Sequence, residues 1–358
     1  MRRFIGGFLL AGVLASAALG ARPMAWGPEL DKEAPPLDPK LLAVVRFGAG
    51  GDQCFTAVQA GADGAVGAGG GLRAFVVVRP DDTVQVKYGG NLAAGGGDLG
   101  AGISAFKSKT LGKFTYGYKQ VHAILQQPYI NGPGWKWWDW TYDQCKPRER
   151  MADSRCTFLA NMPNGHLIAF GKCDGGNTSL RVDPRNLDEK LPFKILHGGG
   201  GGTSSFVFEI DPAGGEPVRQ LILRGFANNV CWDYWGRVMV VGRGIIPKAK
   251  NDFGYGDGAG IMMADREWTQ TLFSTHVGTE GGGGASFWAC DINSSSGIAA
   301  VGGFVEGDVK QVGGLQTRPG GGKDALLAVF RLWKPVTKEP DKGAPVPEPR
   351  KPAPRISY

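Results

Sequence analysis

The stretch CWDYWGRVMVVG, residues 231–242, has the pattern of a β-hairpin. Apolar residues flank a turn at Gly236, and the segment RVMVV after the turn is typical of a strand. A second glycine, Gly242, follows six residues after the turn glycine. The same spacing recurs in three other stretches, which are CFTAVQAGADGAVGAGG (54–70, glycines 64 and 70), CTFLANMPNGHLIAFG (156–171, glycines 165 and 171) and CDINSSSGIAAVGG (290–303, glycines 297 and 303).

An apolar segment follows each hairpin, in most cases after a glycine-rich run. The four segments are 73–82, 204–215, 259–268 and 324–335. A repeated antiparallel unit of three or four strands is what a β-propeller blade needs. We therefore expect an all-β chain that forms a β-propeller of about five to seven irregular blades. A β-sandwich, or two small β domains, is the alternative. The longest interval, between Gly64 and Gly165, leaves room for a further degenerate unit.

The repeat resembles a bacterial β-propeller repeat, the SBBP repeat. Its usual hairpin reads V-D-x-x-G-x-x-Y-V-x-G, and Asp233, Gly236 and Gly242 match it. Its usual strand reads G-G-G-D-A-F-V, and the segment GGDA at 321–325, interrupted by Lys323, is similar to it. The other three hairpins have Gly61, Met162 and Ser294 in place of the aspartate. The resemblance implies a propeller fold, and it implies little about function because propellers host unrelated activities.

The two ends of the chain differ from the repetitive body at 42–334. Residues 1–20 combine Arg2 and Arg3 with a short apolar stretch and small residues, which predicts a secretory signal peptide. Residues 21–41 read as a proline-rich leader, and 335–358 as a proline-rich disordered tail. We expect a secreted, periplasmic or cell-envelope protein with no integral membrane span after signal cleavage.

Charge and composition bear on the class of partner. The net charge is +7, but two basic residues lie in the signal and six in the segment from Lys334 onward, so the body is close to neutral. A nucleic-acid binder concentrates positive charge on its folded surface, and we therefore expect no nucleic-acid partner. The 59 glycines are about twice the usual share and indicate many tight connections.

The stretch GPGWKWWDWTYDQC, residues 132–145, holds four of the ten tryptophans in the longest interval between hairpins. We predict a Trp-rich insert near 91–155. Strand alternation would place Trp135, Trp137 and Asp139 on one face, with Trp138 and Trp140 on the other. Aromatic rings with polar neighbours suit a flat ligand such as a glycan, so Trp135, Trp137, Asp139 and Tyr142 are the ligand-binding candidates. The alternative is that these rings belong to the core.

Other polar motifs give fewer candidates. A two-residue turn at Asn164-Gly165 would place Cys156 directly opposite Cys173 and predicts a cross-strand disulfide, whereas a longer turn would shift the register and break it. Cys231 and Cys290 lie in apolar strands and are expected as buried free thiols. Asp252 and Asp257 in a glycine-rich loop are calcium candidates, with ordinary Asx turns as the alternative. The four histidines are expected in loops, solvated or hydrogen-bonded.

The sequence carries no complete catalytic motif and no cofactor signature, so we expect a binding protein more than an enzyme. The hypothesis is a secreted β-propeller that binds or scaffolds, recognising a glycan or a protein through its loops. The alternatives are an extracellular enzyme acting on polysaccharides and a structural component of the cell envelope. An enzyme of that kind needs two carboxylates at a defined separation, and the sequence nominates no such pair.

Overall fold

The computed structural model describes residues 33–48, 51–70, 72–91, 108–122, 125–145, 153–174, 180–193, 204–245, 258–279, 284–310, 312–313 and 322–335. The predicted signal peptide, most of the leader and nearly all of the tail lie outside these residues. The calcium candidates Asp252 and Asp257 lie outside them as well. Among the described residues, no helix is long and apolar enough to cross a membrane.

The described residues form five four-stranded antiparallel sheets, which we number as blades along the chain. Blade 1 contains β2 (Phe55–Ala60), β3 (Ala65–Gly70), β4 (Leu72–Val78) and β5 (Val84–Asn91). Blade 2 contains β6 (Ser108–Leu111), β7 (Phe114–His122), β8 (Leu125–Gly132) and β9 (Trp135–Trp137). Blade 3 contains β10 (Asp153–Asn161), β11 (Leu167–Asp174), β14 (Ser204–Asp211) and β15 (Glu216–Arg224).

Blade 4 contains β16 (Phe226–Trp232), β17 (Val238–Arg243), β18 (Ala259–Ala264) and β19 (Thr271–Val277). Blade 5 contains β20 (Ala285–Asn293), β21 (Ile298–Val305), β22 (Asp324–Arg331) and, from the start of the chain, β1 (Lys40–Phe47). A small hairpin of β12 (Val182–Asp183) and β13 (Asn186–Lys190) and one helical turn, α2 (Tyr142–Cys145), complete the described elements. The all-β fold with propeller-type blades is therefore confirmed.

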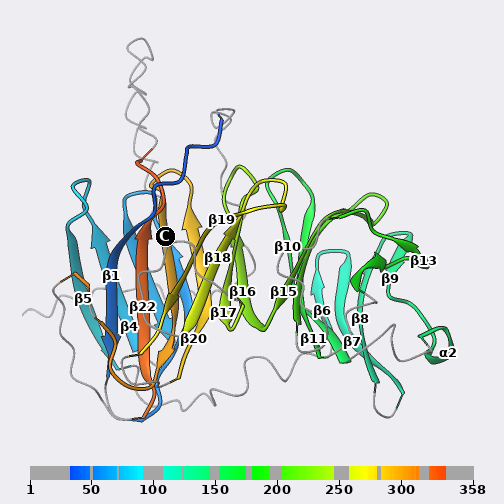
Figure 1. Cartoon of the computed structure of the whole chain (residues 1–358), viewed down its shortest axis with the longest axis horizontal. Helices are drawn as coiled ribbons and strands as arrows, with labels where there is room; N and C mark the ends of the chain where they lie inside the picture. Colours follow the sequence, from blue (N-terminus) through cyan, green and yellow to red (C-terminus); the bar gives the residue numbers. More distant parts are fainter. Residues whose placement is uncertain are drawn as a thin grey trace, which may run out of the picture.

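Successive blades pack face to face through their first strands. The strand β2 packs on β20 and β21, β20 on β16 and β17, β16 on β11 and β14, and β10 on β7 and β8. The blades thus follow one another in the order 1, 5, 4, 3, 2, which Figure 1 shows as a row from left to right. Blades 1 and 2 are consecutive in the chain but lie at opposite ends of this row, and their described residues make no extensive contact.

All four predicted hairpins are present. In each hairpin the two glycines are required for different structural reasons. The turn glycines have positive φ, for example 85° at Gly236, a conformation that disfavours other residues. The second glycine of each hairpin faces a β-bulge in the first strand. A methyl group at Gly70 would lie 2.0 Å from Cys54 O, and the equivalent positions of the other blades are as crowded, at Gly171, Gly242 and Gly303. The repeat therefore encodes a turn and a bulge at a fixed separation.

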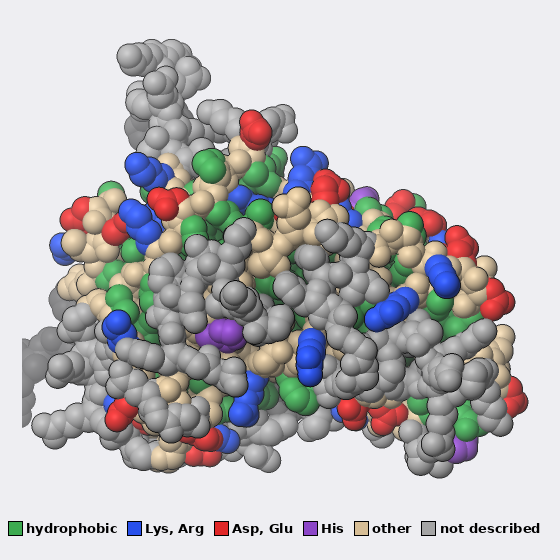
Figure 2. Space-filling view, in the orientation of Figure 1, with side chains coloured by type: hydrophobic (Ala, Val, Ile, Leu, Met, Phe, Trp, Pro, Cys, Tyr) green, Lys and Arg blue, Asp and Glu red, His purple; other side chains and the backbone are tan. Residues whose placement is uncertain are grey.

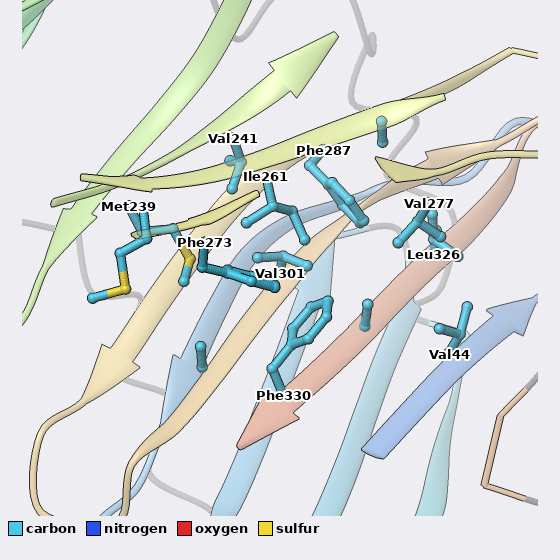
Figure 3. Packing of buried hydrophobic residues seen from close by; sticks show 14 of the residues in the cluster. Val44, Met239, Val241, Ile261, Phe273, Val277, Phe287, Val301, Leu326 and Phe330 are labelled. Atoms are coloured by element: carbon cyan, nitrogen blue, oxygen red, sulfur yellow. The ribbon is translucent and has the colours of Figure 1, made fainter. Parts of the chain in front are cut away.

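The core lies between the blades. Between blades 4 and 5, Ile261 and Phe273 face Phe287, Val301 and Phe330, and all are fully buried (Figure 3). Similar clusters lie between blades 5 and 1, blades 3 and 4, and blades 2 and 3. Because the middle strands of the inner blades are covered on both faces, strands such as β18 and β22 are buried along their whole length.

The interval predicted to hold a Trp-rich insert contains blade 2, and the tryptophan stretch supplies its fourth strand, β9. Each of the four predicted apolar segments after the hairpins forms the third strand of a blade: β4, β14, β18 and β22.

Candidate functional site

The strand β9 places the predicted aromatic residues at the edge of blade 2. Its alternation stops at Trp137, because Trp138 has a φ of 54° and its backbone N–H donates to Pro184 O at 2.6 Å. Trp137 and Trp138 are consequently both buried, with ring centroids 5.3 Å apart in an edge-to-face arrangement. The expectation that these two rings lie on opposite faces of a strand is therefore wrong.

Two of the ligand-binding candidates use their polar atoms inside the protein. The indole N–H of Trp135 donates to Pro212 O at 3.0 Å, and that of Trp137 donates to Gly215 O at 2.7 Å. Both carbonyls belong to the β14–β15 turn of blade 3. The Trp135 ring lies between Gly132 and Gly215, where a side chain at either glycine would overlap it. These rings thus anchor blade 2 to blade 3, within the same buried cluster.

Asp139 lies just beyond this cluster and is about half exposed, at 52% of its side chain. Its carboxylate accepts from Lys119 Nζ at 2.8 Å and from Lys136 Nζ at 3.3 Å. The hydrogen bond from Lys119 is the main cause of a lowered pKa for Asp139, with Lys136 adding to it. Asp139 therefore stays ionised near neutral pH and is suited to accepting hydrogen bonds.

Tyr142, the fourth candidate, opens α2 and stacks on His122 at the end of β7. The ring centroids are 4.2 Å apart and the planes are inclined by 15°. Tyr142 is half-buried and His122 is exposed. The pairs Lys119–Asp139 and His122–Tyr142 share a separation of 20 residues, so the segment 139–142 runs beside the end of β7. Lys119, His122, Lys136, Asp139 and Tyr142 form one surface, which we name the blade 2 strip.

The sequence identified only part of the blade 2 strip. The sequence does not point to Lys119 and His122, since they lie 20 residues from their partners and only the pairing of β7 with β8 and the path of 138–142 bring them close. Their position on the strand before the tryptophans is the one signal that could have suggested them. His122 ends a strand and His276 lies within β19 as a buried residue, so neither is the loop residue expected.

The register of blade 3 does not place Cys156 opposite Cys173. The turn is longer than the two residues assumed, since Met162 N donates to His166 O, and a bulge follows Cys156. Cys156 therefore faces Gly171, and Cys173 faces Ser154. The opposed pairing from which the disulfide was predicted is thus wrong. Burial raises the pKa of the Cys173 thiol to about 11.

A second polar cluster lies on blade 3 and is structural in character. Glu209 is fully buried and accepts from Arg219 Nη1 at 2.5 Å and from Asn164 Nδ2 at 2.8 Å, and His166 Nδ1 lies 2.6 Å from it. These contacts tie the β10–β11 turn to the neighbouring strands β14 and β15. His166 is hydrogen-bonded beside a turn, as expected for it.

No protein-family profile matches the sequence, and no curated protein sequence matches it either. Among solved structures, the chain is similar to an acylaminoacyl peptidase of Pyrococcus horikoshii, at 13% identity and a TM-score of 0.29, over 69% of this chain and 36% of the peptidase. It is also similar to Pseudomonas fluorescens PhoX in complex with vanadate, at 12% identity and a TM-score of 0.25, over 79% of this chain and 54% of PhoX. The chain thus spans about a third of the length of the peptidase.

Proposed function

We propose that this protein is a binding or scaffold protein of propeller type, secreted or held in the cell envelope, and that the blade 2 strip contacts its ligand. The main support for this proposal is that the segment 139–142 lies beside the end of β7. This arrangement brings an exposed carboxylate, two lysines and a stacked ring pair together on one surface. The SBBP-like hairpins and the predicted signal peptide support an exported propeller.

The chemistry of the strip favours a glycan. Aromatic rings offer apolar faces to sugar rings, while a fixed carboxylate and ammonium groups can bond hydroxyls in the directions that they require. Asp139 is held between Lys119 and Lys136, so its oxygens are oriented before a ligand arrives. Preorganisation of this kind lowers the entropic cost of binding. The buried Trp135 and Trp137 support the strip from beneath by fixing β9 against blade 3.

Glycan-array binding by the purified full chain tests the proposal. We expect retention of a saccharide class that falls at least about tenfold in affinity in Tyr142→Ala and in Asp139→Asn, because one stacking surface or one charged acceptor contributes about 1.4 kcal/mol or more. Phe75→Ala is the matched control, since Phe75 is an exposed aromatic residue on blade 1. Binding that is equally weakened by Phe75→Ala, or no saccharide retained at all, would contradict the proposal.

A further inference from the structure

The contact between blades 4 and 5 places two cysteines side by side. Asn228 Nδ2 of β16 donates to Phe287 O of β20 at 2.8 Å, and Asn229 Nδ2 donates to Trp288 O at 3.1 Å. In both pairs the two residues are 59 positions apart in the sequence, so β16 and β20 run side by side in the same direction along this contact. Two residues further on, the same separation brings Cys231 beside Cys290.

The surroundings of the two cysteines agree with this placement. Farther along the same contact, Tyr234 N donates to Ser294 Oγ at 2.9 Å, so the contact is held on both sides of the cysteines. Cys231 belongs to the core cluster between blades 4 and 5, and Cys290 packs against that cluster from the other blade. Burial raises the pKa of the Cys231 thiol, and the adjacent Cys290 thiol adds to the shift. Each cysteine therefore has the other as its neighbour across the interface.

We propose that Cys231 and Cys290 form a disulfide that links blade 4 to blade 5. Cys231 and Cys290 lie on strands that are held beside one another by the two asparagine hydrogen bonds. A disulfide requires Cα atoms about 4.4–6.8 Å apart, a range that a side-chain-to-backbone hydrogen bond between adjacent strands brings within reach.

The oxidant is a small-molecule or protein disulfide acting by thiol–disulfide exchange. Cys290 is the more exposed thiol, and its thiolate attacks one sulfur of the external disulfide and releases the first thiolate. Cys231 then attacks the Cys290 sulfur of the mixed disulfide and releases the second. Two electrons pass to the external disulfide, and the two cysteine protons end on the two released thiols. Burial and the neighbouring Cys290 raise the pKa of Cys231, so the second step is slow in the folded state.

Oxidation of the full chain tests the proposal. The protein is incubated with oxidised glutathione in the folded state, and in parallel refolded from urea in a glutathione buffer so that slow exchange does not limit the result. Mass mapping of a non-reduced digest should reveal a peptide pair joined through Cys231 and Cys290, with the loss of two hydrogens. Adding dithiothreitol should separate the pair.

Cysteine-to-serine variants test whether the linkage is specific to Cys231 and Cys290. Cys231→Ser and Cys290→Ser should each abolish the joined peptide, and Cys231→Ser should leave a glutathione adduct on the more exposed Cys290, whereas Cys54→Ser, a buried cysteine next to blade 1, should leave the joined peptide intact. If a serine variant fails to fold, mass mapping of the chain without substitutions still tests the Cys231–Cys290 linkage. A glutathione adduct on Cys290 without linkage after refolding, or linkage of either residue to another cysteine, would overturn the proposal.

Discussion

The indole N–H of Trp137 on blade 2 donates a hydrogen bond of 2.7 Å to the backbone carbonyl of Gly215 on blade 3. Trp137 is fully buried, and its ring also packs edge-to-face on Phe208 with centroids 5.1 Å apart. A residue that looked suited to ligand binding in the sequence thus joins two blades.

Trp137→Phe should destabilise the fold by about 1–3 kcal/mol, because it leaves the buried Gly215 carbonyl without a donor and removes ring volume. Trp137→Ala should cost about 3–5 kcal/mol. Urea unfolding followed by tryptophan fluorescence and circular dichroism measures both values. Lys136→Ala, at the exposed neighbouring position, should change stability by less than about 0.5 kcal/mol. Equal losses at 136 and 137 would contradict the assignment of Trp137 as the anchor.

Adjacent glycines in β3 should respond very differently to the same substitution. Gly70→Ala should destabilise by at least about 1–3 kcal/mol, because its methyl group would meet Cys54 O at 2.0 Å. Gly69→Ala meets nothing within 4 Å and should be neutral or slightly stabilising. Thermal unfolding compares the Gly69→Ala and Gly70→Ala variants. Gly242→Ala, at the equivalent position of blade 4, should destabilise the protein as Gly70→Ala does. A tolerated Gly70→Ala would show that the bulge can shift.

Loss of one member of the buried ion pair Asp233–Arg237 should lower the free energy of unfolding far more than loss of both charges. Arg237 Nε donates to Asp233 Oδ2 at 2.5 Å, and the guanidinium also lies over the Trp333 ring and donates to Pro35 O. Arg237→Met should cost about 3–5 kcal/mol, since it strands a carboxylate that is fully buried.

Asp233→Asn combined with Arg237→Met should recover part of that loss, as measured by a double-mutant cycle in urea. Arg243→Met, at an exposed position in the same strand region, serves as the control and should be nearly neutral. Additive losses in the double variant would mean that the two side chains act independently.

Asp291 should make stability depend on pH. Burial raises its pKa to about 6, although its Oδ2 accepts from Ala60 N at 2.8 Å. A raised carboxyl pKa favours the protonated form in the folded state, so the contribution is present below the unfolded pKa near 3.8 and is lost as the pH rises through about 6.

Asp291→Asn does not titrate and keeps an acceptor for Ala60. Its free energy of unfolding relative to the natural chain should therefore increase by up to about 3 kcal/mol between pH 4 and pH 7, from about 1.4 kcal/mol per unit of pKa shift. Urea unfolding at several pH values gives this difference directly. A difference that is constant with pH would show that Asp291 is not the group responsible.

The sequence predicted those blades in which the turn and the bulge each require a glycine. Gly236 needs positive φ and Gly242 needs room for Phe226 O, so two glycines six residues apart signal one hairpin. The aspartate of the repeat is explained as well, because Asp233 Oδ1 accepts from the backbone N–H groups of Trp235 and Arg237. Blade 2 has a tight turn at Gly112 and no such second glycine, and its strands could not be located from the sequence.

The candidate site was harder to predict because its parts meet only through packing. Strand alternation grouped Trp137 with Asp139, but the positive φ of Trp138 ends the strand between them. The opposition of Cys156 and Cys173 depended on a turn length that one extra residue changes. Acidic and basic side chains are interspersed on the face of the molecule shown in Figure 2.

The pairing of β1 with β22 joins strands from the two ends of the described chain. During synthesis, β1 emerges early but must wait for β22, almost the whole chain later, before its backbone groups can pair. Its sequence KLLAVVRF is largely apolar and would be exposed in that interval. Contacts so distant in sequence form slowly and leave a nascent chain prone to aggregation. Blade 5 is therefore completed only after β22 has emerged, and β1 is a site of aggregation risk until then.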